Sequence, residues 1–72
     1  MAQGQMVAGE PLDLNTASVE ELIGLIGISE MVAESIIDYR DANGGFHSVA
    51  DLLEVEGFNE GWYERIRLLV TA

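Results

Sequence analysis

Two short turns in this chain of 72 residues could bind an anion through their backbone. Leu25-Ile26-Gly27-Ile28 and Val55-Glu56-Gly57-Phe58 share the pattern apolar-x-Gly-apolar, and residues that begin a helix follow each turn. The first amides of a helix have no intrahelical acceptor and lie at the positive end of the helix dipole, so they attract phosphate groups. Glycine allows another group to approach the backbone closely. Because such a turn needs glycine in any case, a purely structural role is the alternative interpretation.

Acidic side chains recur on the helices expected after these turns. Glu30, Glu34 and Asp38 follow one another at intervals of four residues, and Glu60 and Glu64 repeat the start of this acidic stripe. Like charges at this spacing cost about 0.2–0.5 kcal/mol per pair in an isolated helix, so local helix stability does not favour them. Two interpretations remain open: a solvated face of a salt-adapted protein, and a docking surface for a basic partner.

The other candidate ligands and nucleophiles form no known catalytic or metal-binding pattern. The chain has no cysteine, and its single histidine, His47, has no second ligand candidate nearby in the sequence. We therefore expect His47 to be an ordinary surface residue. Helical carboxylates without a surrounding loop lack the spacing of calcium or zinc sites, and no catalytic triad or phosphate-binding lysine loop is present. The sequence predicts a protein that is not an enzyme and has no metal and no cofactor.

The charge balance argues against binding to anionic surfaces. Thirteen acidic residues against three arginines, with no lysine, give a net charge of −10. This surface repels phosphate polymers and anionic membranes, so we expect no membrane contact. No stretch approaches the ~20 apolar residues of a membrane span, and the first residues lack the pattern of a signal peptide. A cytoplasmic location is the default expectation, although a longer natural precursor could carry a signal.

Residues 18–39 and 48–69 are two copies of one unit. Each copy contains a short helix, the glycine turn and a second helix, which is the pattern of a helix-hairpin-helix motif. A domain this small needs both copies to share one core. We predict an all-α fold of four main helices, in two helix-hairpin-helix motifs related by a pseudo-two-fold axis. The matching pairs include Ser18 with Ser48, Leu22 with Leu52, Gly27 with Gly57, Glu30 with Glu60, Glu34 with Glu64 and Ile36 with Ile66.

Capping signals define the predicted elements. Ser18 with Glu21, and Ser48 with Asp51, read as capping boxes, in which a serine hydroxyl and an acid each accept from a backbone amide. Ser29 and Asn59 are suited to cap the second helix of each copy. The predicted helices span 19–25, 30–43, 49–55 and 60 to nearly the C-terminus, with Gly44 as the left-handed residue that ends the second of them. Residues 1–11 are predicted to be a flexible tail and 12–72 the domain.

Apolar periodicity predicts which side chains form the shared core. Leu12 and Leu14 belong to an extended lead-in that can lie across it. Trp62 aligns with Val32 and is expected to be buried, whereas a platform that stacks on bases is the alternative. The predicted core is Leu14, Val19, Leu22, Leu25, Ile28, Val32, Ile36, Phe46, Val49, Leu52, Val55, Phe58, Trp62, Ile66 and Leu69.

Three segments carry a resemblance to a known family. They are Asp13-Leu14-Asn15-Thr16-Ala17-Ser18, Ile36-Ile37-Asp38-Tyr39-Arg40 and Phe46-His47-Ser48-Val49-Ala50-Asp51-Leu52-Leu53. Over about residues 12–71 the pattern resembles the tandem helix-hairpin-helix domain of the ComEA competence family. That resemblance implies a small all-helical domain that binds double-stranded DNA through its backbone, independently of sequence. Related domains are structural pieces of extrinsic photosystem and secretion-system proteins.

The resemblance implies two DNA-backbone sites, made of Gly27, Ile28, Ser29, Glu30, Gly57, Phe58, Asn59 and Glu60. The family hairpin usually reads Gly-apolar-Gly and is commonly followed by a basic residue. In this chain Ser29 and Asn59 replace the second glycine, and a glutamate follows each of them. A glutamate in the first turn of a helix interacts favourably with the dipole by ~0.3–1 kcal/mol, and its carboxylate would face an incoming phosphate.

Because of these departures, the sequence supports two functional interpretations. The first interpretation is a non-catalytic module that binds another protein, or a structural subunit, with the acidic stripe (Glu30, Glu34, Asp38, Glu60, Glu64) facing a basic partner. The alternative is attenuated binding of the double-stranded DNA backbone, as in the ComEA family. With only three arginines, the counterion release that drives such binding would be small.

Overall fold

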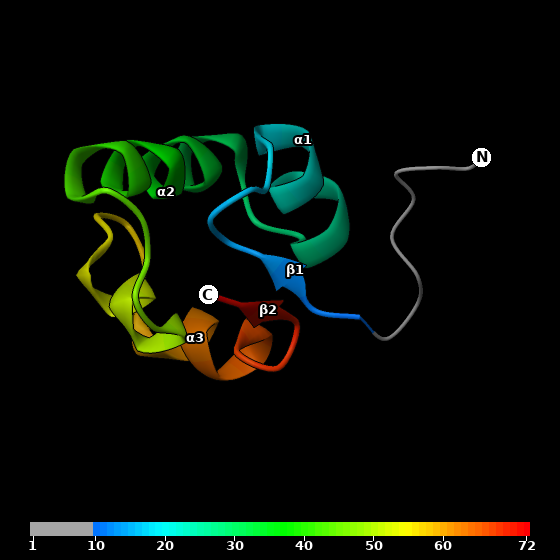
Figure 1. Cartoon of the computed structure of the whole chain (residues 1–72). Helices are drawn as coiled ribbons and strands as arrows, with labels where there is room; N and C mark the ends of the chain where they lie inside the picture. Colours follow the sequence, from blue (N-terminus) through cyan, green and yellow to red (C-terminus); the bar gives the residue numbers. More distant parts are fainter. Residues whose placement is uncertain (1–9) are drawn as a thin grey trace.

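A computed structural model describes residues 10–72 and shows a mostly helical chain closed by two very short strands (Figure 1). Most of the tail predicted over 1–11 therefore lies outside the described residues. The elements in chain order are β1 (Leu12–Asp13), α1 (Val19–Glu21), η1 (Leu22–Ile26), α2 (Glu30–Asn43), η2 (Val49–Glu54), α3 (Glu60–Ile66) and β2 (Val70–Thr71). No helix in this part of the chain is both long and apolar enough to cross a membrane.

The strands correct the prediction of a purely helical fold. β1 pairs with β2 in parallel, with Leu12 opposite Val70, and the two arrows lie side by side in Figure 1. The Leu12 amide donates to the Leu69 carbonyl at 2.8 Å, and the Leu14 amide donates to the Thr71 carbonyl at 2.8 Å. The predicted continuation of the last helix to the C-terminus is wrong, because α3 ends at Ile66. An extended C-terminus supplies acceptors for lead-in amides that a longer helix would leave unpaired.

The first helix of each copy departs from regular α geometry, and in opposite directions. After one turn of α1 the chain widens into a π-helix, η1, whereas η2 is a tighter 3₁₀-helix. The wider winding turns Leu22 and Ile26, four residues apart, toward the core and leaves Leu25 47% exposed. In η2 the buried residue is Leu52, and the extended residue that follows this helix, Val55, is buried as well. The predicted burial of Leu25 in the core is therefore wrong.

The second helices begin where the sequence predicts. The Ser29 hydroxyl accepts from the Val32 amide at 3.2 Å at the start of α2, and the Asn59 side chain accepts from the Trp62 amide at 2.9 Å at the start of α3. α2 ends at Asn43, and Gly44 follows with a left-handed φ of +73°. Both starts and this end are therefore set by local capping, as predicted.

The core joins residues from all parts of the described chain. Nine predicted core residues are buried: Leu14, Leu22, Ile28, Ile36, Phe46, Leu52, Val55, Phe58 and Ile66. Four others, Val19, Val32, Val49 and Trp62, are partly buried and pack against this core. The predicted burial of Leu69 is wrong, since this side chain is 46% exposed, and Val70 on β2 is buried instead. The sequence-based core list also omitted Leu12, Ala17, Ile26 and Ala33, which are buried.

The two capping boxes differ in which side chain makes the stronger contacts. The Glu21 amide donates to the Ser18 hydroxyl at 3.1 Å, and the Ser18 amide donates to the Glu21 carboxylate at 2.9 Å. In the second box the Asp51 carboxylate accepts from the His47 amide at 2.9 Å and from the Ser48 amide at 3.2 Å. These amides, that of His47 most strongly, hold the pKa of Asp51 below its ordinary value.

We expect Ser18→Ala to lower the free energy of unfolding by about 0.5–2 kcal/mol, and Ser48→Ala to lower it by less. The Asp51 carboxylate keeps its two amide donors when the Ser48 hydroxyl is removed, whereas Ser18→Ala removes the acceptor of the Glu21 amide. Urea unfolding of both variants measures the difference. Equal losses would show that the second box depends on its serine as much as the first.

Candidate nucleic-acid interface

Both hairpin turns require glycine for their backbone conformation. Gly27 has φ +83° and Gly57 has φ +86°, a left-handed region that other residues adopt rarely, and no non-glycine residue from 10 to 72 has a positive φ. A Cβ added to Gly27 would meet no atom within 4 Å, and one added to Gly57 would meet only Val32 Cγ2, at 3.8 Å. The surface above both turns is therefore open to another molecule.

The helix starts beside these turns keep unpaired amides. Ser29 and Asn59 each accept one amide through the side chain and one through the carbonyl, from residues three and four positions on. The amides of Glu30 and Met31 in α2, and of Glu60 and Gly61 in α3, find no acceptor among the described residues. Each hairpin thus presents two amide donors, from which water or an anion can accept a hydrogen bond.

An acidic side chain lies in the first turn of each of these helices. Glu30 and Glu60 are exposed and occupy the first turn of α2 and α3. The remaining members of the acidic stripe, Glu34, Asp38 and Glu64, are exposed as well, and Glu64 forms an ion pair with Arg67 at 3.2 Å.

His47 is exposed at the surface. Within the described range, no three His, Cys, Asp or Glu side chains come together as metal ligands.

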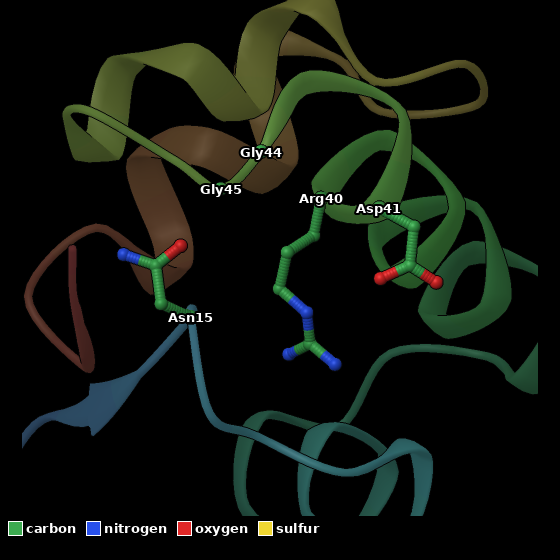
Figure 2. Close-up of a pocket in the computed structure, with 5 residues that line it drawn as sticks. All are labelled: Asn15, Arg40, Asp41, Gly44 and Gly45. Atoms are coloured by element: carbon green, nitrogen blue, oxygen red, sulfur yellow. The ribbon is translucent and has the colours of Figure 1, made fainter.

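Arg40 forms hydrogen bonds with backbone carbonyls inside the fold. Its Nη1 donates to the Leu14 carbonyl at 3.0 Å and to the Ala17 carbonyl at 2.9 Å, so it joins α2 to the loop after β1. Figure 2 shows its side chain extending from α2 toward that loop, with Asn15 across an open pocket of about 360 Å³. The Asn15 side chain in turn accepts from the Phe46 amide and donates to the Phe46 carbonyl. Asp41, Gly44 and Gly45 complete the pocket lining.

The other two arginines lie at the surface of the last helix. Arg67 follows α3 and pairs with Glu64, as described above. The guanidinium carbon of Arg65 lies over the Trp62 ring, 5.3 Å from its centroid. Reading the sequence for anion sites missed this Arg65–Trp62 pair, although the signal was available: residues three apart on a helix are neighbours.

The fold and the two turns define the protein class. The sequence matches the helix-hairpin-helix motif family over residues 7–71, and the chain belongs to that family. It is 40% identical over 63 residues to ComE operon protein 1 of Bacillus subtilis (strain 168), a match that covers 88% of this chain and 31% of that protein. The expected resemblance to the ComEA family is thereby confirmed.

Other relatives place the same domain in different proteins. The chain is 41% identical over 61 residues to endonuclease/exonuclease/phosphatase family domain-containing protein 1 of Homo sapiens, covering 85% of this chain and 11% of that protein. It is 37% identical over 62 residues to an uncharacterized protein of Haemophilus influenzae, covering 85% of this chain and 55% of that protein. This chain spans less than two thirds of the length of each of these relatives, so the matches concern the domain.

Proposed function

We propose that this chain is a non-catalytic module that binds the backbone of double-stranded DNA without reading its sequence. The observation that carries the proposal is the pair of open glycine turns, each beside two helix amides with no acceptor among the described residues. Backbone amides at such turns bind phosphate oxygens, which carry no sequence information. Membership of the helix-hairpin-helix family and similarity to a ComE operon protein support the same function.

The proposal includes the arrangement expected from the repeat. Residues 12–72 form one domain in which two helix-hairpin-helix units, related by an approximate two-fold axis, present their turns to one duplex. The first interpretation of the sequence, a protein-binding module with an acidic docking stripe, has no support from the relatives. The DNA-binding alternative fits the family better, and we adopt it.

The binding is attenuated by charge. Glu30 and Glu60 place carboxylates beside the amides that would meet phosphate, and the net charge of −10 repels the duplex at longer range. Each phosphate that a cationic side chain neutralises adds about 0.9 to the steepness with which the logarithm of the binding constant falls against the logarithm of the salt concentration (the log–log salt slope). This chain has few cations that could contribute. We therefore expect binding at physiological salt to be weaker than ordinary non-specific binding, that is, with a dissociation constant above the ~10⁻⁴–10⁻⁶ M typical of it.

Fluorescence anisotropy with two labelled duplexes of unrelated sequence tests this function. We expect both to bind with equal affinity at about 20 mM salt, and binding to become weak or unmeasurable at about 150 mM salt. A single-stranded oligonucleotide of the same composition serves as the control and should bind more weakly. If neither duplex gives saturable binding at the lower salt concentration, the proposed function is wrong.

A further inference from the structure

We propose that Arg65, stacked on Trp62, is the side chain that contacts a DNA phosphate beside the second hairpin. This inference rests on the proposed function and assigns its cationic contact to one residue. Nothing in the repeat predicts it, because the position equivalent to Arg65 in the first copy is Ser35.

The three arginines differ in what their guanidinium groups contact. The chain has three arginines and no lysine. Arg40 donates to two backbone carbonyls inside the fold, and Arg67 is paired with the Glu64 carboxylate at 3.2 Å. Arg65 has no hydrogen-bond or ion-pair partner among the described residues and is exposed. Among the described residues, it is therefore the arginine with all of its N–H donors unpaired.

Arg65 has uncharged neighbours one helical turn before it. One helical turn before it lie Gly61 and Trp62, neither of which carries a charge, whereas Arg67 has Glu64 at the corresponding distance. The contact with the Trp62 ring uses the charge of the guanidinium and leaves its N–H groups free for a phosphate. Because stacking restricts the side chain in advance, less conformational entropy is lost when the phosphate binds.

Arg65 belongs to the same helix as the unpaired amides of the second hairpin. Arg65 lies on α3, the helix that follows the Gly57 turn, four residues after Gly61, so it shares a helix face with Gly61 and lies about 6 Å further along the axis. Gly61 has no side chain that would stand between the unpaired amides and Arg65. A backbone that contacts the turn can therefore continue along α3 to the guanidinium, so we infer that the second hairpin binds DNA more strongly than the first.

The test compares Arg65→Gln with the matched variant Arg67→Gln, which removes the same charge two residues away. At about 20 mM salt we expect Arg65→Gln to weaken duplex binding by about tenfold and to lower the log–log salt slope by about 1. Arg67→Gln should change both far less, because the Arg67 guanidinium is already paired with the Glu64 carboxylate. Arg65→Lys keeps the charge and should retain the slope.

The single tryptophan gives a second, independent readout. Adding duplex should change Trp62 emission in the unmodified chain and in Arg67→Gln, and change it less in Arg65→Gln. Equal affinities, equal slopes and equal emission changes in the two glutamine variants would overturn the inference while leaving DNA binding in place. Failure of the unmodified chain to bind at low salt would overturn both the inference and the proposed function.

Discussion

Replacing Leu52 by alanine should lower the free energy of unfolding by about 2–5 kcal/mol. Leu52 is fully buried in η2 and is one of the largest side chains without solvent exposure. The substitution removes apolar contacts and leaves a cavity that surrounding side chains fill only partly. Because a domain of this size has a total stability of roughly 5–15 kcal/mol or less, the loss should unfold a considerable fraction of the molecules.

The adjacent Leu53 provides the matched control. It belongs to the same short helix and undergoes the same chemical change, but it is 39% exposed. We expect Leu53→Ala to cost less than about 1 kcal/mol. Urea unfolding followed by circular dichroism measures both variants. Similar losses at the two positions would mean that η2 faces the core with a different side from the one described here.

Reversing the charge of the two hairpin acids should strengthen the proposed DNA binding to the range of ordinary non-specific binders. Glu30→Lys with Glu60→Lys keeps the glycine turns and the unpaired amides but changes the sign of the charge beside each of them. We expect the dissociation constant at about 150 mM salt to fall into the ~10⁻⁴–10⁻⁶ M range, and the log–log salt slope to steepen by about 0.9 for each new phosphate contact. Anisotropy titrations at two salt concentrations measure both quantities.

The control for this gain changes the net charge equally at other sites. Each replacement of an acid by lysine adds two units of charge, so either double variant moves the chain from −10 to −6. Glu20→Lys with Asp41→Lys alters exposed acids outside both hairpins and should improve binding only slightly. The hairpin variant loses a favourable dipole interaction of ~0.3–1 kcal/mol at each helix, so its folding is checked first. An equal gain in both variants would show that general charge, and not the hairpins, limits binding.

Local signals in the sequence were sufficient for the long helix and for both turns. Ser29, Asn59 and Gly44 determine where helices begin and end through contacts with neighbours a few residues away, so their positions could be predicted. Gly27 and Gly57 also followed from the sequence, because a tight turn between two helices needs a left-handed residue.

Long-range contacts account for what the sequence did not reveal. The pairing of β1 with β2 joins opposite ends of the domain, and it decides that Val70 is buried and Leu69 exposed. The different winding of η1 and η2 was not predicted either, and Leu25 is exposed whereas Val55 is buried, despite their equivalent positions in the repeat. A repeat predicts similar elements, but it does not require identical winding.

The candidate site shows the same division. The turns and their acids were identified from the sequence, whereas the uses of the arginines were not. Arg40 meets the carbonyls of Leu14 and Ala17, more than twenty residues away in the sequence, and only the folded chain reveals this commitment. Arg67 is paired with Glu64, whereas Arg65 lies over the Trp62 ring and has no hydrogen-bond partner among the described residues.

Mapping amide chemical shifts by NMR while a short DNA duplex is added tests the central claim most directly. At about 20 mM salt, where non-specific electrostatic binding is strongest, we predict the largest changes at residues 27–31 and 57–61, with smaller changes around Arg65. These residues contain both glycine turns and the unpaired helix amides. Changes confined to other parts of the chain, or no changes at this salt concentration, would contradict the account of two DNA-binding hairpins.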